Sequence, residues 1–228
     1  MTEYVIDLPP VVALPVSGTG KRFPVRRVYC IGRNYAAHAV EMGGDPDREA
    51  PFFFQKNAGN LYVGDEFPYP VKSEDVHHEA EMAVMLKSGG TSIPVDRALE
   101  HVYGYALALD MTRRDLQAEA KKAGRPWEVS KAFEHSAPLG PIHTVEQVGH
   151  LAEGALKLTV NGETRQEGDL NQLIWKVPEM ISYLSDYFEL AAGDVILSGT
   201  PAGVGAVQRG DEMVLSIEKL GSMTVRVV

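Results

Sequence analysis

Two glutamates, Glu79 and Glu81, stand two residues apart in segment 79–86, whose other residues are apolar and predict a buried strand. Side chains alternate between the two faces of a strand, so both carboxylates must point to the same side of a sheet. Two carboxylates side by side in a poorly hydrated place repel each other unless a positive group lies between them. The spacing therefore fits either a solvated strand face or a cation site, and spacing alone leaves both open.

A second predicted strand, 103–110, ends in a third carboxylate, Asp110. Its odd positions hold Tyr or Leu, and its even positions hold Gly or Ala up to Asp110. One face of this strand therefore carries almost no side chains, and another segment must pack closely against that bare face. A charge beside such a face needs a partner, which favours the cation site. Three carboxylates without cysteine or an obligatory histidine form an all-oxygen ligand set, which suits Mg²⁺, Mn²⁺ or Ca²⁺.

Composition limits the class of protein. The 228 residues fit one domain, and we expect a lead-in segment at 1–24 followed by a catalytic domain at 25–228. Many short predicted strands with three or four helices indicate a mixed β fold of the α+β class. The net charge of −9 argues against nucleic acid or an anionic membrane as partner.

The single cysteine, Cys30, excludes an intrachain disulfide and a CxxC zinc site. The first residues lack the basic and apolar pattern of a secretory signal, and no apolar run is long enough to span a membrane. We therefore expect a soluble, cytoplasmic protein.

Several local elements follow from turn and loop signals. Residues 43–60 predict a long loop around the apolar run 52–54, which is typical of a lid. Asn161-Gly162 predicts a tight hairpin, and the segment 178–188 predicts a helix with one apolar side. Thr112 is placed to cap the helix that follows it.

A predicted helix after Gly32 carries His38 and Glu41, which are neighbours on one face because they lie three residues apart. Spacing alone fits an ordinary helical pair. The functional alternative is a dyad, in which the carboxylate orients an imidazole that takes a proton from water.

Polar residues also stand near the starts of predicted elements: Arg33, Arg114, Gln117 and Lys131. Each alone fits an ordinary surface position. Together they could bind the carboxylates of a small acidic substrate, because guanidinium and ammonium groups pair well with carboxylates.

Six segments, taken in order, resemble the fumarylacetoacetate hydrolase family: Gly32–His38, Pro51–Lys56, His78–Val84, Tyr105–Asp115, Trp127–Phe133 and Leu197–Gly205. In its short length the chain is similar to the acylpyruvases, which include fumarylpyruvate and maleylpyruvate hydrolases. The resemblance runs from about residue 25 to the end. It implies a single-domain β-roll or β-sandwich and a homodimer.

By matching motif, the resemblance implies that Glu79, Glu81 and Asp110 hold one Mg²⁺ or Mn²⁺ per subunit. Both ions suit oxygen ligands, so the sequence does not choose between them. The resemblance also implies three catalytic residues, His38, Glu41 and Lys131. The first two would activate water, and the lysine would stabilise negative charge on the substrate or on a tetrahedral oxyanion.

Four residues are expected to contact the substrate: Arg33, Arg114, Gln117 and Thr200. One departure from the family concerns Lys56-Asn57, where many relatives have Lys-Pro. Asparagine restores a backbone N–H and frees φ, so the resemblance defines the lid path, and with it the distal end of the substrate site, less closely than the metal site.

These features together predict hydrolysis of a C–C bond in a 2,4-diketo acid, such as fumarylpyruvate or maleylpyruvate, in the catabolism of aromatic compounds. The products are pyruvate and a second carboxylic acid. Oxaloacetate decarboxylation and keto-acid isomerisation are alternatives at the same metal site. A non-catalytic, metal-stabilised binding protein is an alternative from another class.

Overall fold

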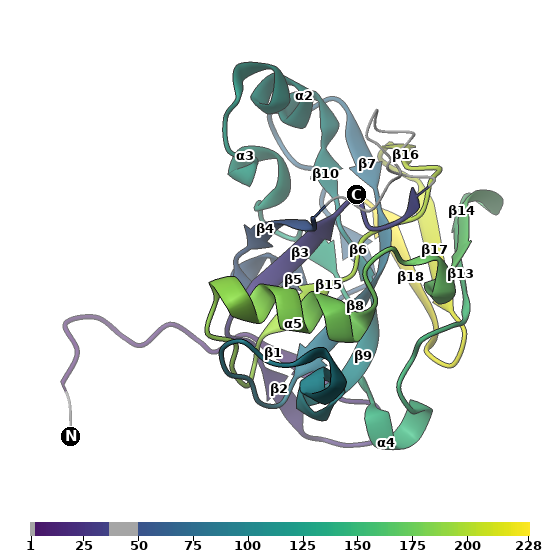
Figure 1. Ribbon diagram of the computed structural model, residues 1–228. Coiled ribbons are helices and arrows are strands. Elements are labelled where there is room, and N and C mark those ends of the chain that lie inside the picture. The colour runs from purple at the N-terminus through teal and green to yellow at the C-terminus, as the bar shows by residue number, and fades with distance from the viewer. Residues whose placement is uncertain (1–2, 37–49) are drawn as a thin grey trace.

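The computed structural model describes residues 3–36 and 50–228. A six-stranded sheet forms the centre of this part of the chain (Figure 1). Its strands, in spatial order, are β12 (His143–Thr144), β9 (Val102–Leu109), β8 (Ala80–Leu86), β15 (Val195–Leu197), β3 (Val28–Gly32) and β4 (Phe52–Lys56). All neighbours are antiparallel except β15 and β3, so the sheet is mixed.

A five-stranded sheet packs beside it, in the order β14 (Glu163–Asp169), β13 (Ala155–Val160), β17 (Glu212–Ile217), β18 (Gly221–Val227) and β6 (Glu66–Phe67). The turn between β13 and β14 is Asn161-Gly162, with φ of 52° and 81°. Both angles are positive, as a type I′ turn requires, so the predicted hairpin is confirmed.

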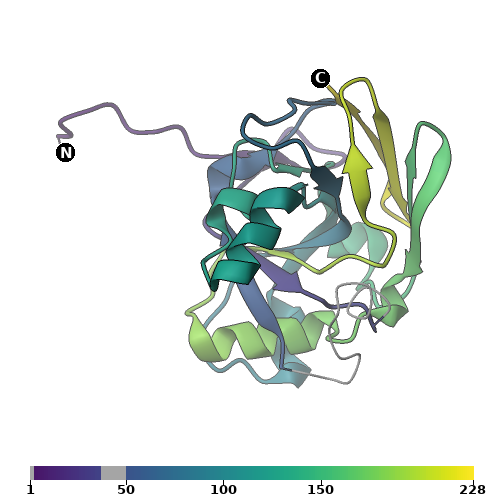
Figure 2. The same ribbon diagram turned by 90° about the horizontal axis from the view of Figure 1, so that it is seen from above.

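Smaller sheets complete the described strands. One joins β10 (Thr112–Arg113), β7 (Val76–His78) and β16 (Gly205–Val207). Two strand pairs are β1 (Ala13–Pro15) with β2 (Arg22–Pro24), and β5 (Leu61–Tyr62) with β11 (Ala137–Pro138). The segment before β1 extends away from the rest of the chain (Figure 2).

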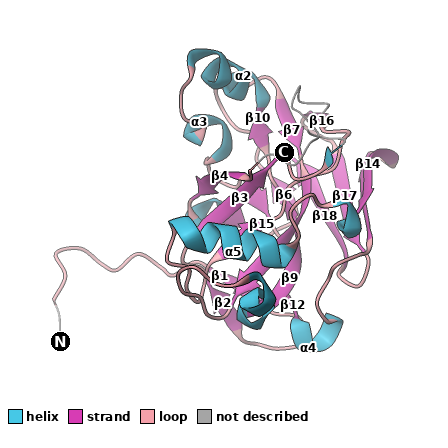
Figure 3. Cartoon of the chain, in the orientation of Figure 1, coloured by secondary structure: helices cyan, strands magenta, loops and turns pink. Residues whose placement is uncertain are grey.

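Helices are few and lie around the strands (Figure 3). The α-helices within residues 50–228 are α2 (Arg114–Ala123), α3 (Glu128–Lys131), α4 (Val145–Val148) and α5 (Val177–Tyr187). The 3-10 helices are η1 (Ala58–Asn60), η2 (Val95–His101) and η3 (Leu170–Gln172). This content confirms the predicted mixed β fold with few helices. No helix within residues 3–36 and 50–228 combines the length and apolar character needed to cross a membrane.

The two faces of the central sheet pack against different layers. Met82, Tyr105 and Leu107 belong to a core shared with the five-stranded sheet and α5. Ala106 and Ala108 belong to a second core shared with β1, β2 and β11. The predicted bare face is thus confirmed: short side chains let other backbone approach closely.

The run Phe52–Phe54 is not a loop, which corrects the sequence expectation. It belongs to β4, which pairs with β3 from Val28↔Lys56 to Gly32↔Phe52. Aromatic residues favour strands because their rings pack on both faces of a pleated sheet. Phe53 lies 5.7 Å from the ring of Tyr183 on α5, measured between ring centroids. The remainder of the expected lid includes 43–49, which lies outside the described residues.

Candidate metal centre and substrate cavity

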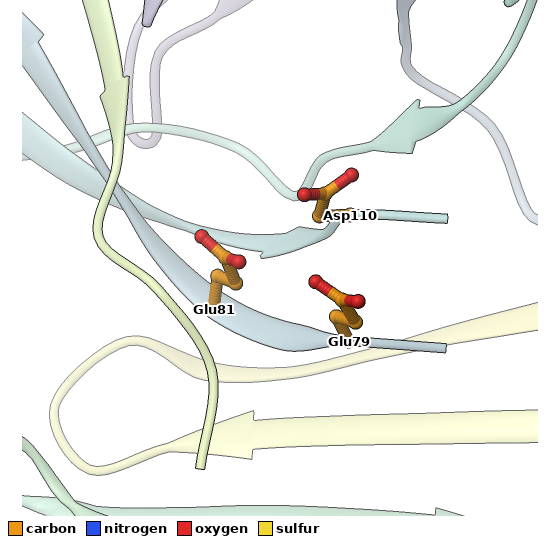
Figure 4. Close-up of side chains that lie close together, drawn as sticks. All are labelled: Glu79, Glu81 and Asp110. Atoms are coloured by element: carbon orange, nitrogen blue, oxygen red, sulfur yellow. The ribbon is translucent and has the colours of Figure 1, made fainter. Parts of the chain in front are cut away.

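The register of β8 and β9 brings three carboxylates together. Ala80 pairs with Leu109, and the Asp110 N–H donates to the Glu79 carbonyl at 2.8 Å, so Glu79 and Asp110 stand opposite each other. Glu81 follows two residues along on the same face. Figure 4 shows the three side chains rising from neighbouring strands to the same side. One oxygen from each lies within 4.8 Å of the others.

These carboxylates are buried and only partly compensated. Glu79, Glu81 and Asp110 are 5%, 2% and 0% exposed. Burial, together with the charges of Asp110 and Glu79, raises the pKa of Glu81 well above its usual range. Asp110 Oδ1 accepts no hydrogen bond from the described residues, although Lys56 Nζ lies 2.9 Å away. The all-oxygen donor set, its burial and the crowding of three carboxylates fit a hard divalent cation.

Two buried lysines flank the carboxylates. Lys131 Nζ donates to Glu79 Oε2 at 2.9 Å and to Asp110 Oδ2 at 2.8 Å. Burial lowers the Lys131 pKa, but the charges of Asp110 and Glu79 outweigh it, so the pKa lies above its usual value. Lys56 Nζ donates to Ser136 Oγ at 2.9 Å and to the Lys131 carbonyl. Lys56 therefore supports both Asp110 and the backbone of Lys131.

Arg114, at the start of α2, orients a metal-ligand candidate. Its Nη2 donates to Glu79 Oε1 at 2.6 Å, and its Nη1 donates to Gln117 Oε1 at 2.6 Å. Because the Gln117 oxygen accepts from arginine, the NH₂ group of that amide is left as the donor for other partners. Direct contact of Arg114 and Gln117 with a substrate stays a prediction.

Thr112 does not cap the following helix, which corrects the sequence expectation. The N-cap of α2 is Arg113, and no side chain caps it. Thr112 Oγ1 instead lies 3.2 Å from Glu79 Oε1 and accepts from Lys131 Nζ at 2.6 Å. Hydrogen bonds to charged groups are about twice as strong as neutral ones, so the buried ions compete successfully for this hydroxyl.

A buried amide fixes the orientation of Thr200. Gln166 Oε1 accepts from the Ala80 N–H at 3.0 Å, and its Nε2 donates to the Pro201 carbonyl at 2.9 Å, so the amide orientation is unambiguous. Nε2 also donates to Thr200 Oγ1 at 2.8 Å, so the hydroxyl proton of Thr200 can donate to an acceptor other than Gln166. His78 Nδ1, 2.9 Å from Gln166 Oε1, must then be the protonated ring nitrogen.

One cavity opens onto the carboxylates. Besides the carboxylates, its lining combines aromatic, cationic and other polar side chains: Arg33, Phe52, Phe54, Arg114, Gln117, Lys121, Trp127, Lys131 and Thr200. Every predicted site residue in the described ranges therefore lines this cavity. His38 and Glu41 lie outside the described residues, so their place and roles stay predictions.

Sequence reasoning missed Lys56, Thr112, Lys121 and Gln166. Lys56 ends a strand for which the local pattern predicts a loop, and Gln166 lies in a hairpin far from the other motifs in sequence. Lys56 ends Pro51–Lys56, one of the six segments that carry the family resemblance, and that is the signal that could have drawn attention to it.

The comparison with known families agrees with this geometry. The family model described as "Fumarylacetoacetate (FAA) hydrolase C-terminal" matches residues 27–228. The chain belongs to the fumarylacetoacetate hydrolase family. The family resemblance inferred from the six motifs is therefore confirmed.

Solved and curated members of the family are similar over nearly the whole chain. A fumarylpyruvate hydrolase from Pseudomonas aeruginosa, solved with Mn²⁺ and pyruvate, is 50% identical with a TM-score of 0.97 and 99% coverage of both chains. This match confirms the single-domain family fold. The oxaloacetate tautomerase YcgM of Escherichia coli is 40% identical, over 90% of this chain and 94% of its own. A mitochondrial oxaloacetate tautomerase of Rattus norvegicus is 40% identical, over 89% and 91%.

Proposed function

We propose that this family member hydrolyses an acylpyruvate, with fumarylpyruvate as the leading substrate, to pyruvate and a carboxylic acid. The observation that carries the proposal is the buried cluster of Glu79, Glu81 and Asp110 at the base of a cavity with four cationic side chains. The similarity to a fumarylpyruvate hydrolase supports the choice of substrate.

The proposed cofactor is one Mg²⁺ or Mn²⁺, held by Glu79, Glu81 and Asp110. Each carboxylate oxygen has two lone pairs, so Glu79 can keep its bonds to Arg114 and Lys131 while it binds a cation. When bound, such a cation supplies Lewis-acid polarisation of the keto oxygen of a 2-oxo acid.

The described residues would position the substrate. Thr200 has a hydroxyl proton left to donate, and Gln117 has an amide NH₂ group, so both suit a substrate carboxylate. The positive charge of Lys131 would stabilise negative charge that develops on the substrate. Phe52 and Trp127 would exclude water from one wall of the cavity.

Hydrolysis itself needs an activated water. We propose that His38, oriented by Glu41, removes a proton from that water, which then attacks the distal carbonyl carbon. The C–C bond breaks, its electrons leave as the enolate of pyruvate, and the proton taken up by His38 passes to the terminal carbon of that enolate to give pyruvate. The distal carbonyl becomes the second carboxylic acid.

A substrate panel tests this function. We expect the Mg²⁺- or Mn²⁺-loaded protein to release pyruvate from fumarylpyruvate, maleylpyruvate or acetylpyruvate, measured with lactate dehydrogenase. His38→Ala should abolish this release. If none of the acylpyruvates releases pyruvate, the proposal is overturned and a binding protein is favoured.

Oxaloacetate tautomerisation is the second candidate, favoured by the identity to two oxaloacetate tautomerases. It moves a proton between carbon and oxygen and needs no attacking water. The decay of enol absorbance measures it, whereas CO₂ release measures oxaloacetate decarboxylation. Retention of decarboxylation in His38→Ala, with loss of acylpyruvate hydrolysis, would support the water-activating dyad, whereas equal loss of both would contradict it.

The homodimer and the cytoplasmic location remain proposals drawn from the resemblance and the composition. Light scattering on the purified protein tests the first, with a mass of twice 24.9 kDa expected.

A further inference from the structure

Two cations in the cavity, Arg33 and Lys121, differ from the others in having no anionic partner among the described residues. Neither forms an ion pair with a carboxylate within residues 3–36 and 50–228. Lys131, by contrast, pairs with Glu79 and Asp110, and Arg114 pairs with Glu79. We call Arg33 and Lys121 the rim cations, because both are half-buried whereas Lys131 is buried.

Aromatic rings hold the rim cations in place. Arg33 Cζ lies 5.7 Å from the ring centroid of Phe52, and Lys121 Nζ lies 5.2 Å from that of Trp127. The two rings meet edge to face at 5.5 Å, so they join the cations into one wall of the cavity. A cation over a ring face is attracted to it and keeps its charge available on the other side.

The backbone of Arg33 is also unusual. Its φ is 56°, in the left-handed region that non-glycine residues rarely adopt. Backbone strain of this kind clusters at ligand-binding positions and persists where the surrounding structure enforces it. Gly32, the preceding residue, has no room for a side chain, because an added Cβ would lie 2.1 Å from Phe52 Cζ.

Positive charge accumulates at this wall. The pKa of Lys121 is lowered by burial first and then by the charges of Arg114 and Arg33. The charge of Lys131 also lowers this pKa, while that of Glu79 raises it, so three neighbouring cations oppose the charge of the lysine. An anion bound between them would relieve this repulsion.

We propose that Arg33 and Lys121 form a subsite for the carboxylate at the distal end of a dicarboxylic keto acid. This inference rests on the proposed function, which places the 2-oxo acid end of the substrate at the carboxylate cluster. The rim cations line the same cavity as that cluster. The site is therefore built for a substrate with an acid at each end, such as fumarylpyruvate, in preference to a monoacid such as acetylpyruvate.

Kinetics with matched substrates test the subsite. In Lys121→Gln, the ratio of kcat/KM for fumarylpyruvate to kcat/KM for acetylpyruvate should fall about tenfold, mainly through KM, since a charge-assisted hydrogen bond is lost. Lys121→Arg should keep the ratio, because it keeps the charge. Lys122→Gln is the control, because Lys122 is the exposed neighbour on the same helix. An unchanged ratio in Lys121→Gln and Arg33→Gln would overturn the proposal.

Ligand binding separates this inference from the proposed function. Calorimetry on the Mg²⁺-loaded protein should show fumarate binding more tightly than crotonate, which has a methyl group in place of one carboxylate. Lys121→Gln should remove the difference. If fumarate is preferred but no acylpyruvate is cleaved, the subsite stands and the proposed function fails. If acylpyruvates are cleaved but the wild type binds fumarate and crotonate equally, the subsite fails.

Discussion

The inner and outer parts of the cavity use positive charge in opposite ways. At the base, Lys56 and Lys131 are buried and lie against Asp110, 2.9 and 2.8 Å from its two oxygens. At the rim, Arg33 and Lys121 rest on aromatic rings and pair with no carboxylate in the described chain. The base is therefore preorganised by its own ion pairs, whereas the rim keeps its charge for a ligand.

The largest expected effect comes from removing one carboxylate at the base. Glu81→Gln should lower kcat/KM by about a thousandfold, because metal polarisation contributes several kcal/mol to the transition state. The metal-free variant should be no less stable than the metal-free wild type, since one of three crowded charges is gone. Steady-state kinetics and thermal unfolding measure the two effects. Glu119→Gln, on an exposed part of α2, is the control.

Next in size is the loss of a buried lysine. Lys56→Met should reduce the free energy of unfolding by about 3 kcal/mol, because Asp110 would stay buried with one ammonium group fewer. Denaturant titration of the metal-free protein measures this change. Equal stability of Lys56→Met and wild type would show that the base does not depend on this ion pair.

The hydrogen bonds behind Thr200 should have an intermediate effect. Gln166→Glu replaces a donor with an acceptor, so the Thr200 proton should turn toward residue 166 and away from the cavity. We expect kcat/KM to fall about 10- to 100-fold, the range for groups that orient a site from behind. In a Thr200→Val background the same substitution should cause little further loss. Additive effects in this double-mutant cycle would argue against the coupling.

The smallest effect is expected on the stability of the protein when a rim cation is replaced. Lys121→Gln should change the free energy of unfolding by less than about 0.5 kcal/mol, because no carboxylate loses its partner. Measured beside Lys56→Met under the same conditions, it tests the contrast directly. A loss as large as that of Lys56→Met would mean that Lys121 has a structural partner.

Local sequence pattern predicted the placement of the carboxylates at the base of the site, and the family resemblance supplied their role. Strand parity placed Glu79 and Glu81 on one face, and the small residues before Asp110 indicated the closely packed sheet beside them. Both follow from the geometry of one or two strands, which is why they could be predicted. The hairpin at Asn161-Gly162 and the helix α5 were predictable for the same reason.

The remaining features depend on contacts between distant segments. Lys56 contacts both Ser136 and Asp110, and Gln166 contacts Thr200, across separations of tens of residues. The periodic pattern of apolar residues in a sequence carries no information about contacts between such distant segments. Flanking glycine and proline residues favour a loop at Phe52–Phe54, whereas pairing with β3 makes this run a strand. Local signals are weakest where a strand depends on its partner.

The most direct test of the account is the dependence of acylpyruvate cleavage on a divalent cation. Pyruvate release from fumarylpyruvate should be measured after exhaustive chelation with EDTA, removal of the chelator, and addition of Mg²⁺ or Mn²⁺. The account predicts that activity is lost on chelation and returns with either ion, and that Glu81→Gln does not recover. Full activity in the chelated wild-type protein would contradict it.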